Sequence, residues 1–257
     1  MIQKGDFIMI RVLVWNEYKH EQEKEKVAKI YPRGIHNAIA DFLRCDDIEV
    51  RTATLYDENG EISDPTCGIT KEILDETDVL IWWGHAAHQY VPDEVAYLVR
   101  DAVLSGMGFI ALHSAHHSKP FRYLLGTSCN LCWRESGDSE LLWVIEPSHP
   151  ITRGIDRYFK LDAEETYGEP FVIPTPDRLL LIGNYSSGEV FRSGCLYCRG
   201  NGKIFYFQPG HETFPTFFVP EVQTIIRNAV RFVAPTYRET TACPNVRKVG
   251  DPEGYVR

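Results

Sequence analysis

The strongest constraint on the fold is a pattern that occurs three times, in which a short apolar run ends at a cluster of polar residues that includes histidine. The clearest example is residues 108–117, Gly-Phe-Ile-Ala-Leu-His-Ser-Ala-His-His. The run at 78–83 ends in the same way at residues 84–88, and the run at 204–207 ends at residues 208–212. Open α/β sheets carry their functional groups at the carboxyl ends of parallel strands. If the three runs are neighbouring parallel strands, their polar ends meet in one crevice.

The order of elements supports an α/β fold. Apolar runs predict strands near 8–15, 48–55, 78–83 and 108–112, and helical periodicity lies between them, near 33–43 and 95–106. Strands that alternate with helices need right-handed crossovers and form a mostly parallel sheet. We therefore predict an open, mostly parallel sheet with helices on both faces.

Beyond Gly126 the pattern changes to short strands near 141–145, 179–182, 189–191 and 203–207. Arg199-Gly200-Asn201-Gly202 predicts a hairpin turn, and a last amphipathic helix is expected over 221–233. We interpret this region as a small β-rich elaboration of a single domain spanning residues 1–234. The polar tail, residues 235–257, is either a disordered end or an arm over a neighbouring subunit, which leaves a homo-oligomer open.

Composition excludes several classes of function. A net charge of −9 argues against nucleic-acid and anionic-membrane binding, because both need a basic surface. No apolar stretch reaches membrane-spanning length and the N-terminus lacks a signal-peptide pattern, so we expect a soluble cytoplasmic protein. No Gly-x-Gly-x-x-Gly follows a strand, which excludes an NAD or FAD motif of that kind.

The cysteines offer one metal-binding hypothesis. Seven cysteines without an export signal do not predict a disulfide framework. Two pairs have C-x-x-C spacing, Cys129 with Cys132 and Cys195 with Cys198, and together they could hold a structural zinc ion. The alternative is that these are unlinked cysteines acting as small hydrophobes. A redox pair is disfavoured, because neither pair opens a helix after a strand.

Polar and aromatic motifs then recur in order along most of the chain. They are Trp83-Gly84-His85 with His88, Leu112-His113-Ser114, Gly126-Thr127, Trp133-Arg134-Glu135, His149-Pro150-Ile151, Glu164-Glu165-Thr166-Tyr167, Glu189 to Gly194, and Tyr206 to Glu212. Together they resemble the ThuA-like family of trehalose-utilisation proteins over Ile8 to Ala234. The resemblance implies a flavodoxin-like fold related to class I glutamine amidotransferases and a role in bacterial sugar catabolism.

The resemblance also locates the active-site position of the amidotransferases. Their cysteine nucleophile falls on His113 when their motif is laid along residues 110–117, so we expect no glutaminase activity. Ser114 lacks the Gly-x-Ser-x-Gly context of a hydrolase nucleophile. Residues 208–212 look like a shifted form of the segment that carries the triad histidine, with His211 or Gln208 at its place.

Imidazoles from three strand ends suit either a divalent metal or general acid–base catalysis. We expect His113, His211, Glu212 and Glu165 to be catalytic, and His85, His113 and His211 to be the ligands of a divalent ion, with zinc favoured. His117 and His149 are expected to be surface or capping residues. The predicted substrate-binding residues are Asn16, Glu17, His36, Trp83, His85, His88, Ser114, Trp133, Tyr167 and Glu189.

These residues favour a small-molecule sugar as the substrate, since aromatic rings stack on sugars and polar side chains bind their hydroxyls. The first hypothesis is an enzyme of trehalose or related disaccharide catabolism, of lyase, hydrolase or isomerase type, with a keto-sugar substrate included. Hydrolysis by a carboxylate pair drawn from Glu164, Glu165 and Glu189 stays open. The alternative is a non-catalytic sugar-binding or regulatory module on an amidotransferase scaffold.

Overall fold

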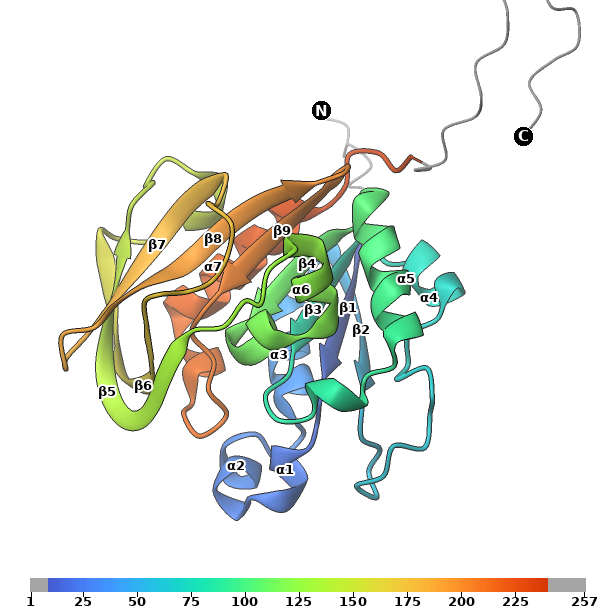
Figure 1. Cartoon of the computed structure of the whole chain (residues 1–257), viewed down its shortest axis with the longest axis horizontal. Helices are drawn as coiled ribbons and strands as arrows, with labels where there is room; N and C mark the ends of the chain where they lie inside the picture. The colour runs from blue at the N-terminus through green and yellow to red at the C-terminus, as the bar shows by residue number, and fades with distance from the viewer. Residues whose placement is uncertain (1–8, 240–257) are drawn as a thin grey trace, which may run out of the picture.

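The computed structural model describes residues 9–239, whose strands form one nine-stranded sheet in the order β2-β1-β3-β4-β9-β8-β7-β5-β6 (Figure 1). The parallel half contains β2 (Ile48–Thr54), β1 (Ile10–Asn16), β3 (Val79–Trp83), β4 (Gly108–Leu112) and β9 (Gly202–Phe207). The antiparallel half contains β8 (Val190–Arg199), β7 (Arg178–Tyr185), β5 (Cys132–Val144) and β6 (Tyr158–Gly168). The predicted α/β fold is confirmed.

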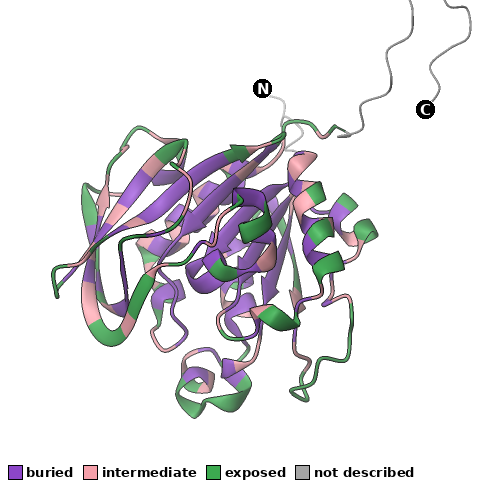
Figure 2. Cartoon of the chain, viewed as in Figure 1, coloured by how far each residue is buried: buried purple, intermediate pink, exposed green. Residues whose placement is uncertain are grey.

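Helices cover both faces of the parallel half. The core on one face includes α3 (Ile35–Leu43) and α7 (Pro220–Val233), and the core on the other includes α4 (Lys71–Asp75), α5 (Asp93–Leu104) and α6 (Lys119–Leu125). Strand side chains alternate between the two cores, so Ile81 faces α3 and α7 whereas Trp82 faces the opposite layer. Figure 2 shows the result, with buried central strands beneath helices whose outer surfaces are exposed.

Six short helical segments complete the described chain. The first two, α1 (His20–Glu23) and α2 (Glu25–Ile30), follow β1, where the sequence predicted a solvated charged segment. The others are the 3-10 turns η1 (His88–Tyr90), η2 (His113–His117), η3 (Pro150–Thr152) and η4 (Thr216–Phe218). Both η1 and η2 follow strands of the parallel half and therefore lie at the edge where polar side chains were expected.

Periodicity predicted the last helix closely. All six residues expected on its apolar face are buried, namely Val222, Ile225, Ile226, Ala229, Val230 and Val233. Burying a side chain of this kind contributes about 1.5–3 kcal/mol for Val or Ile. The hairpin turn was also predicted correctly, because β8 ends at Arg199 and β9 begins at Gly202.

The antiparallel half differs from the expectation in two respects. It continues the main sheet, because β8 pairs with β9 along the hairpin, and so is no separate elaboration. Strand β6 was not predicted at all. Exposed and buried residues alternate only from Tyr158 to Asp162, and the run that follows includes the buried Glu164 and Glu165, so the apolar alternation does not extend along the strand.

The described part of the tail lies against its own chain. Arg238 donates to the carbonyl oxygen of Leu74 at 3.0 Å, and the Glu239 amide donates to the carbonyl of Ser105 at 3.1 Å. Residues 240–257, on which most of the tail hypothesis rests, fall outside the described residues. Within residues 9–239, no helix is long and apolar enough to cross a membrane.

Candidate functional site

Strands β3, β4 and β9 are parallel neighbours, so their carboxyl ends lie at one edge of the sheet. Trp83 is the register partner of Leu112, and Leu112 is the partner of Phe207. The segments that follow bring three imidazole rings together, and their centroids are 5.1 to 5.7 Å apart. The structure thus brings His85, His113 and His211 into one cluster.

His113 occupies a strained turn between β4 and η2. Its φ angle is 53°, a left-handed conformation that is uncommon for residues other than glycine and typical of strand-to-helix elbows that present functional groups. Its buried Nδ1 is 2.9 Å from the carbonyl oxygen of Gln208, to which it donates. In the neutral ring, Nε2 then carries no proton, yet it lies 2.9 Å from Oε2 of Glu165. Two acceptors at this distance need a proton or a cation between them.

His211 is held by a loop that a buried carboxylate fixes. Glu164 accepts hydrogen bonds from the backbone amides of Gly210 and His211, each at 3.0 Å. Trp83 also anchors the loop, because its Nε1 donates to the carbonyl of Gly210 at 2.9 Å. Gly210 has a φ of 140°, and a Cβ atom there would lie 2.8 Å from the ring of Phe217, so only glycine fits. His211 Nδ1 is 2.8 Å from the Thr213 hydroxyl, and no residue that the structure describes forms a hydrogen bond with its buried Nε2.

His85 is placed by two carboxylates. Glu17 accepts hydrogen bonds from the backbone amide of His85 at 2.7 Å and from the backbone amide of Ala86 at 3.0 Å. Glu212 lies behind the ring, with Oε2 3.0 Å from Nδ1 of His85. Glu212 is fully buried, and its other oxygen contacts His20 at 2.7 Å and Lys24 at 3.2 Å.

The three histidines share one arrangement. In each, Nδ1 faces an outer partner, which is a carboxylate, a backbone carbonyl or a hydroxyl, so Nε2 is the nitrogen left for an ion. Metal-binding histidines are oriented in this way. His85, His113, Glu165 and His211 each offer a ligand atom, and these atoms lie within 4.8 Å of one another. A second group, His20, His85 and Glu212, meets the same condition.

The electrostatics of the cluster suit a cation. Burial would raise the pKa of Glu165, but the contact with His113 and its charge bring the pKa below its usual value. For Glu212 too, burial opposes ionisation, and contacts with His20 and His85 lower its pKa despite that. Burial lowers the pKa of His211 to about 3, so its ring is neutral. The pKa of His113 is raised, because interaction with Glu165 outweighs the effect of burial. Two buried carboxylates beside a neutral imidazole favour a bound positive charge.

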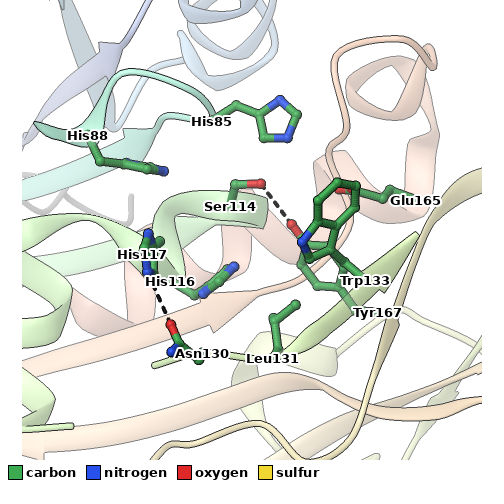
Figure 3. A pocket seen from close by; sticks show the side chains of 10 residues that line it. All are labelled: His85, His88, Ser114, His116, His117, Asn130, Leu131, Trp133, Glu165 and Tyr167. Atoms are coloured by element: carbon green, nitrogen blue, oxygen red, sulfur yellow. Dashed lines mark hydrogen bonds between the residues drawn. The ribbon is translucent and has the colours of Figure 1, made fainter. Parts of the chain in front are cut away.

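A cavity of about 330 Å³ opens beside this cluster (Figure 3). Ten residues line it: His85, His88, Ser114, His116, His117, Asn130, Leu131, Trp133, Glu165 and Tyr167. Figure 3 shows the hydrogen bond between Ser114 and Tyr167, whose oxygen atoms are 2.7 Å apart. The phenol oxygen of Tyr167 is also 3.3 Å from His113 Nε2, which connects the cavity to the buried cluster. Five of the predicted substrate-binding residues therefore line this cavity: His85, His88, Ser114, Trp133 and Tyr167.

Five other predicted substrate residues lie elsewhere. Asn16 and His36 bond to each other at 3.0 Å, and His36 faces a separate cavity near β2. Glu17 binds backbone amides, and Trp83 is buried and holds the Gly210 carbonyl. Glu189 forms an ion pair with Arg134, outside the cavity lining. We correct these assignments: Glu17 and Trp83 position the site, and Asn16, His36 and Glu189 do not line it.

The four paired cysteines are not brought together in the part of the chain that the structure describes. Cys195 and Cys198 lie on β8 three residues apart, so their side chains point to opposite faces; Cys195 is buried and Cys198 exposed. Cys129 is likewise buried and Cys132 exposed. Two cysteines with C-x-x-C spacing come close together in a turn, but in an extended strand their thiols point to opposite faces. The described residues therefore do not support the zinc hypothesis for these cysteines.

Sequence reasoning missed several residues of the site. His20 lies in a charged segment and reaches Glu212 across 192 positions, which only the tertiary fold reveals. His117, expected as a surface or capping residue, is exposed but lines the cavity and contacts Asn130 at 3.2 Å. His149 does cap η3, as expected, by accepting from the Ile151 amide. The signal that could have found His117 is its place beside His116 after β4.

Comparisons with known proteins identify the family and related folds. The ThuA family, described as trehalose utilisation, matches residues 11–233. Among solved structures, a ThuA-like protein from Bacteroides uniformis is similar with a TM-score of 0.62 and 18% identity, over 89% of this chain and 93% of that one. A ThuA-like protein from Parabacteroides merdae gives 0.61 and 14%, over 92% and 93%.

A cytoplasmic protein from Salmonella typhimurium gives a TM-score of 0.59 and 12% identity, over 88% of this chain and 100% of that chain. At these identities the likeness shows a common fold alone. A comparison with curated proteins finds no match. The family match spans most of the chain, including every strand that carries the site, and so the chain belongs to the ThuA family, whose described role is trehalose utilisation.

Proposed function

We propose that this chain is an enzyme of carbohydrate metabolism that works with a divalent metal ion, for which zinc fits best. The observation that carries the proposal is the convergence of His85, His113, His211 and Glu165, whose ligand atoms lie within 4.8 Å of one another. Three imidazole nitrogens and one carboxylate oxygen form a donor set that zinc prefers. Family membership supports a role in carbohydrate use.

An unpartnered buried atom supports the presence of an ion. Nε2 of His211 is buried and forms no hydrogen bond within residues 9–239. Leaving such a group unpaired costs about 1–3 kcal/mol. Oε2 of Glu165 lies 2.9 Å from Nε2 of His113, and a cation bound among these atoms would satisfy all three. When bound, the ion would polarise an oxygen atom of the substrate as a Lewis acid.

The chain's own residues supply the other requirements of such chemistry. Tyr167 and Ser114 present two hydroxyl groups next to the ligand cluster. Burial raises the pKa of Tyr167 well above its usual value, so its phenol stays protonated and can donate to a substrate oxygen. A polarised oxygen and a nearby proton donor suit hydrolase, lyase or isomerase reactions of sugars, including those of a keto-sugar.

Metal content tests the proposal directly. Protein purified without chelator should contain about one zinc ion per chain by elemental analysis, and His113→Ala and His211→Ala should each lose it. His149→Ala is a matched control, because His149 lies at η3 outside the cluster. The loaded protein should then convert a sugar or keto-sugar from a panel that includes trehalose, and a chelator should stop the conversion.

Two results would contradict the proposal. Absence of a stoichiometric ion from protein that was never exposed to chelator would remove its basis. An ion that persists in both alanine variants would show that other residues bind it. Binding of sugars without any turnover would instead favour a sugar-binding or regulatory module.

A further inference from the structure

The cavity has a second wall that contributes no ligand to the proposed ion. It is formed by His88 of η1, His116 and His117 of η2, and Asn130 of the segment after α6 (Figure 3). Nδ1 of His116 bonds to the carbonyl of Cys129 at 2.7 Å, so Nε2 is the nitrogen of His116 that can bond to a ligand. Nε2 of His88 is buried and has no hydrogen-bond partner among residues 9–239. This wall therefore holds polar atoms that a ligand can satisfy.

The charge of the lining restricts what that ligand can be. None of the ten described residues around the cavity is lysine or arginine, the side chains that usually bind phosphate and carboxylate groups. Glu165 is the acidic group of the lining and repels anions. The second wall suits hydroxyl groups better than phosphates.

An aromatic side chain completes this part of the cavity. Trp133 on β5 is 64% exposed, although it lines the cavity beside Leu131 and is the register partner of Tyr167. A large flat apolar surface next to polar groups is the usual platform for the C–H face of a sugar ring. The cavity volume of about 330 Å³ lies at the low end of the range of roughly 300–1,000 Å³ for small-molecule sites. This volume suits a ligand the size of one sugar ring.

We infer that His88, His116, His117, Asn130 and Trp133 form a subsite for one uncharged sugar ring, and that this subsite discriminates against phosphorylated and carboxylated sugars. The inference rests on the proposed function, which makes the ligand a carbohydrate. It adds a set of binding residues that hold no ion and a charge criterion for the substrate.

Binding measurements with four probes test this subsite. The uncharged probes are methyl α-D-glucopyranoside and trehalose, and the charged probes are glucose 6-phosphate and glucuronate. Each is titrated into metal-free and zinc-loaded protein, with ligand-observed NMR and tryptophan fluorescence as readouts. The metal-free protein matters because a bound ion could itself attract an anion. We expect at least one uncharged probe to bind metal-free protein tenfold or more tightly than either charged probe.

Variants place the binding at the second wall. Trp133→Ala should weaken binding of the uncharged probe at least tenfold without changing zinc content, since the exposed Trp133 contributes little to the core. Trp143→Ala is the matched control, because Trp143 is on the same strand but packs against Tyr158 at 4.9 Å between ring centroids. His117→Arg should raise affinity for glucose 6-phosphate, because it adds the missing cation.

The outcomes separate this inference from the proposed function. Equal or tighter binding of the charged probes by metal-free protein, no binding of either uncharged probe in either state, or unchanged binding in Trp133→Ala would each overturn the subsite. If the expected selectivity and the Trp133 effect occur in a protein that binds no zinc, the subsite stands and the metal-dependent function fails.

Discussion

Glu212 lies behind the proposed ion ligands, and its replacement by glutamine probes whether it orients them. The carboxylate is fully buried and contacts four groups, with His85 at 3.0 Å and His211 at 3.5 Å on Oε2, and His20 at 2.7 Å and Lys24 at 3.2 Å on Oε1. Glutamine keeps the shape but removes the negative charge. Its amide nitrogen must face a donor at one end or the other, so His85 or the His20–Lys24 pair loses its acceptor.

The expected magnitude follows from the role of such outer partners. Loss of a carboxylate that orients a metal-binding histidine typically lowers metal affinity by about 10- to 100-fold. One factor of ten corresponds to about 1.4 kcal/mol, so Glu212→Gln should weaken zinc binding by about 1.4–2.8 kcal/mol. Competition with a chromophoric zinc chelator at pH 7.5 measures this difference.

Glu189→Gln serves as the control, because Glu189 pairs with Arg134 away from the cluster and its loss should leave zinc affinity unchanged. Thermal unfolding of the metal-free variants verifies that both still fold. Wild-type zinc affinity in a folded Glu212→Gln protein would refute the reasoning, since it would mean that the ring of His85 needs no carboxylate behind it.

Three further predictions concern stability and metal content. Burial lowers the pKa of His116 to about 3, whereas the unfolded chain protonates it near 6.5, so below pH 6.5 the unfolded state binds more protons at this residue. As the pH falls from 6.5 to 4, wild type should therefore lose stability relative to metal-free His116→Asn. The difference between their free energies of unfolding should change by about 1.4 kcal/mol per pH unit. Urea titrations that show no such trend would contradict the lowered pKa. Gly183→Ala should destabilise the fold by about 1–3 kcal/mol, because its Cβ would lie 2.0 Å from Oε1 of the buried Glu140, whereas Gly168→Ala, whose nearest new contact is at 3.7 Å, should be nearly neutral in the same titration. Cys132→Ser and Cys198→Ser should leave zinc content unchanged by elemental analysis, and a loss of zinc would restore the cysteine site that the strand geometry argues against.

The central strands of the parallel half, β1, β3, β4 and β9, were predictable because they are largely buried on both faces. Such strands appear in the sequence as continuous apolar runs, and β4 was predicted with its observed bounds, Gly108–Leu112. The helix at 220–233 was equally clear, since one face is apolar at helical spacing. In the antiparallel half, β6 alternates exposed and buried residues only from Tyr158 to Asp162, and the buried Glu164 and Glu165 that follow give no apolar signal of a strand.

The site was predictable as far as strand order allowed. Polar residues directly after β3, β4 and β9 had to meet, because parallel neighbours end at the same edge. Asn16 is the last residue of β1 and was assigned to the same crevice, but its amide nitrogen bonds to Glu21 and His36. Local hydrogen bonds decide whether a polar side chain faces the ligand or holds the backbone, and the sequence does not distinguish these roles. Glu17 is an example, because it was expected to bind substrate but accepts hydrogen bonds from backbone amides.

The strained backbone at His113 bears on whether this residue binds an ion or acts as a nucleophile. A non-glycine residue at φ 53° costs about 1–3 kcal/mol and persists where its surroundings fix it. Here the ring stacks on Tyr167 at 5.0 Å, Nδ1 bonds to Gln208, and Nε2 faces Glu165. A nucleophile at such a turn must be exposed to its substrate, but the side chain of His113 is fully buried. A residue that cannot reach a substrate carbonyl can still bind an ion through Nε2. The buried turn therefore fits the proposed role of His113 as an ion ligand better than the role of a nucleophile.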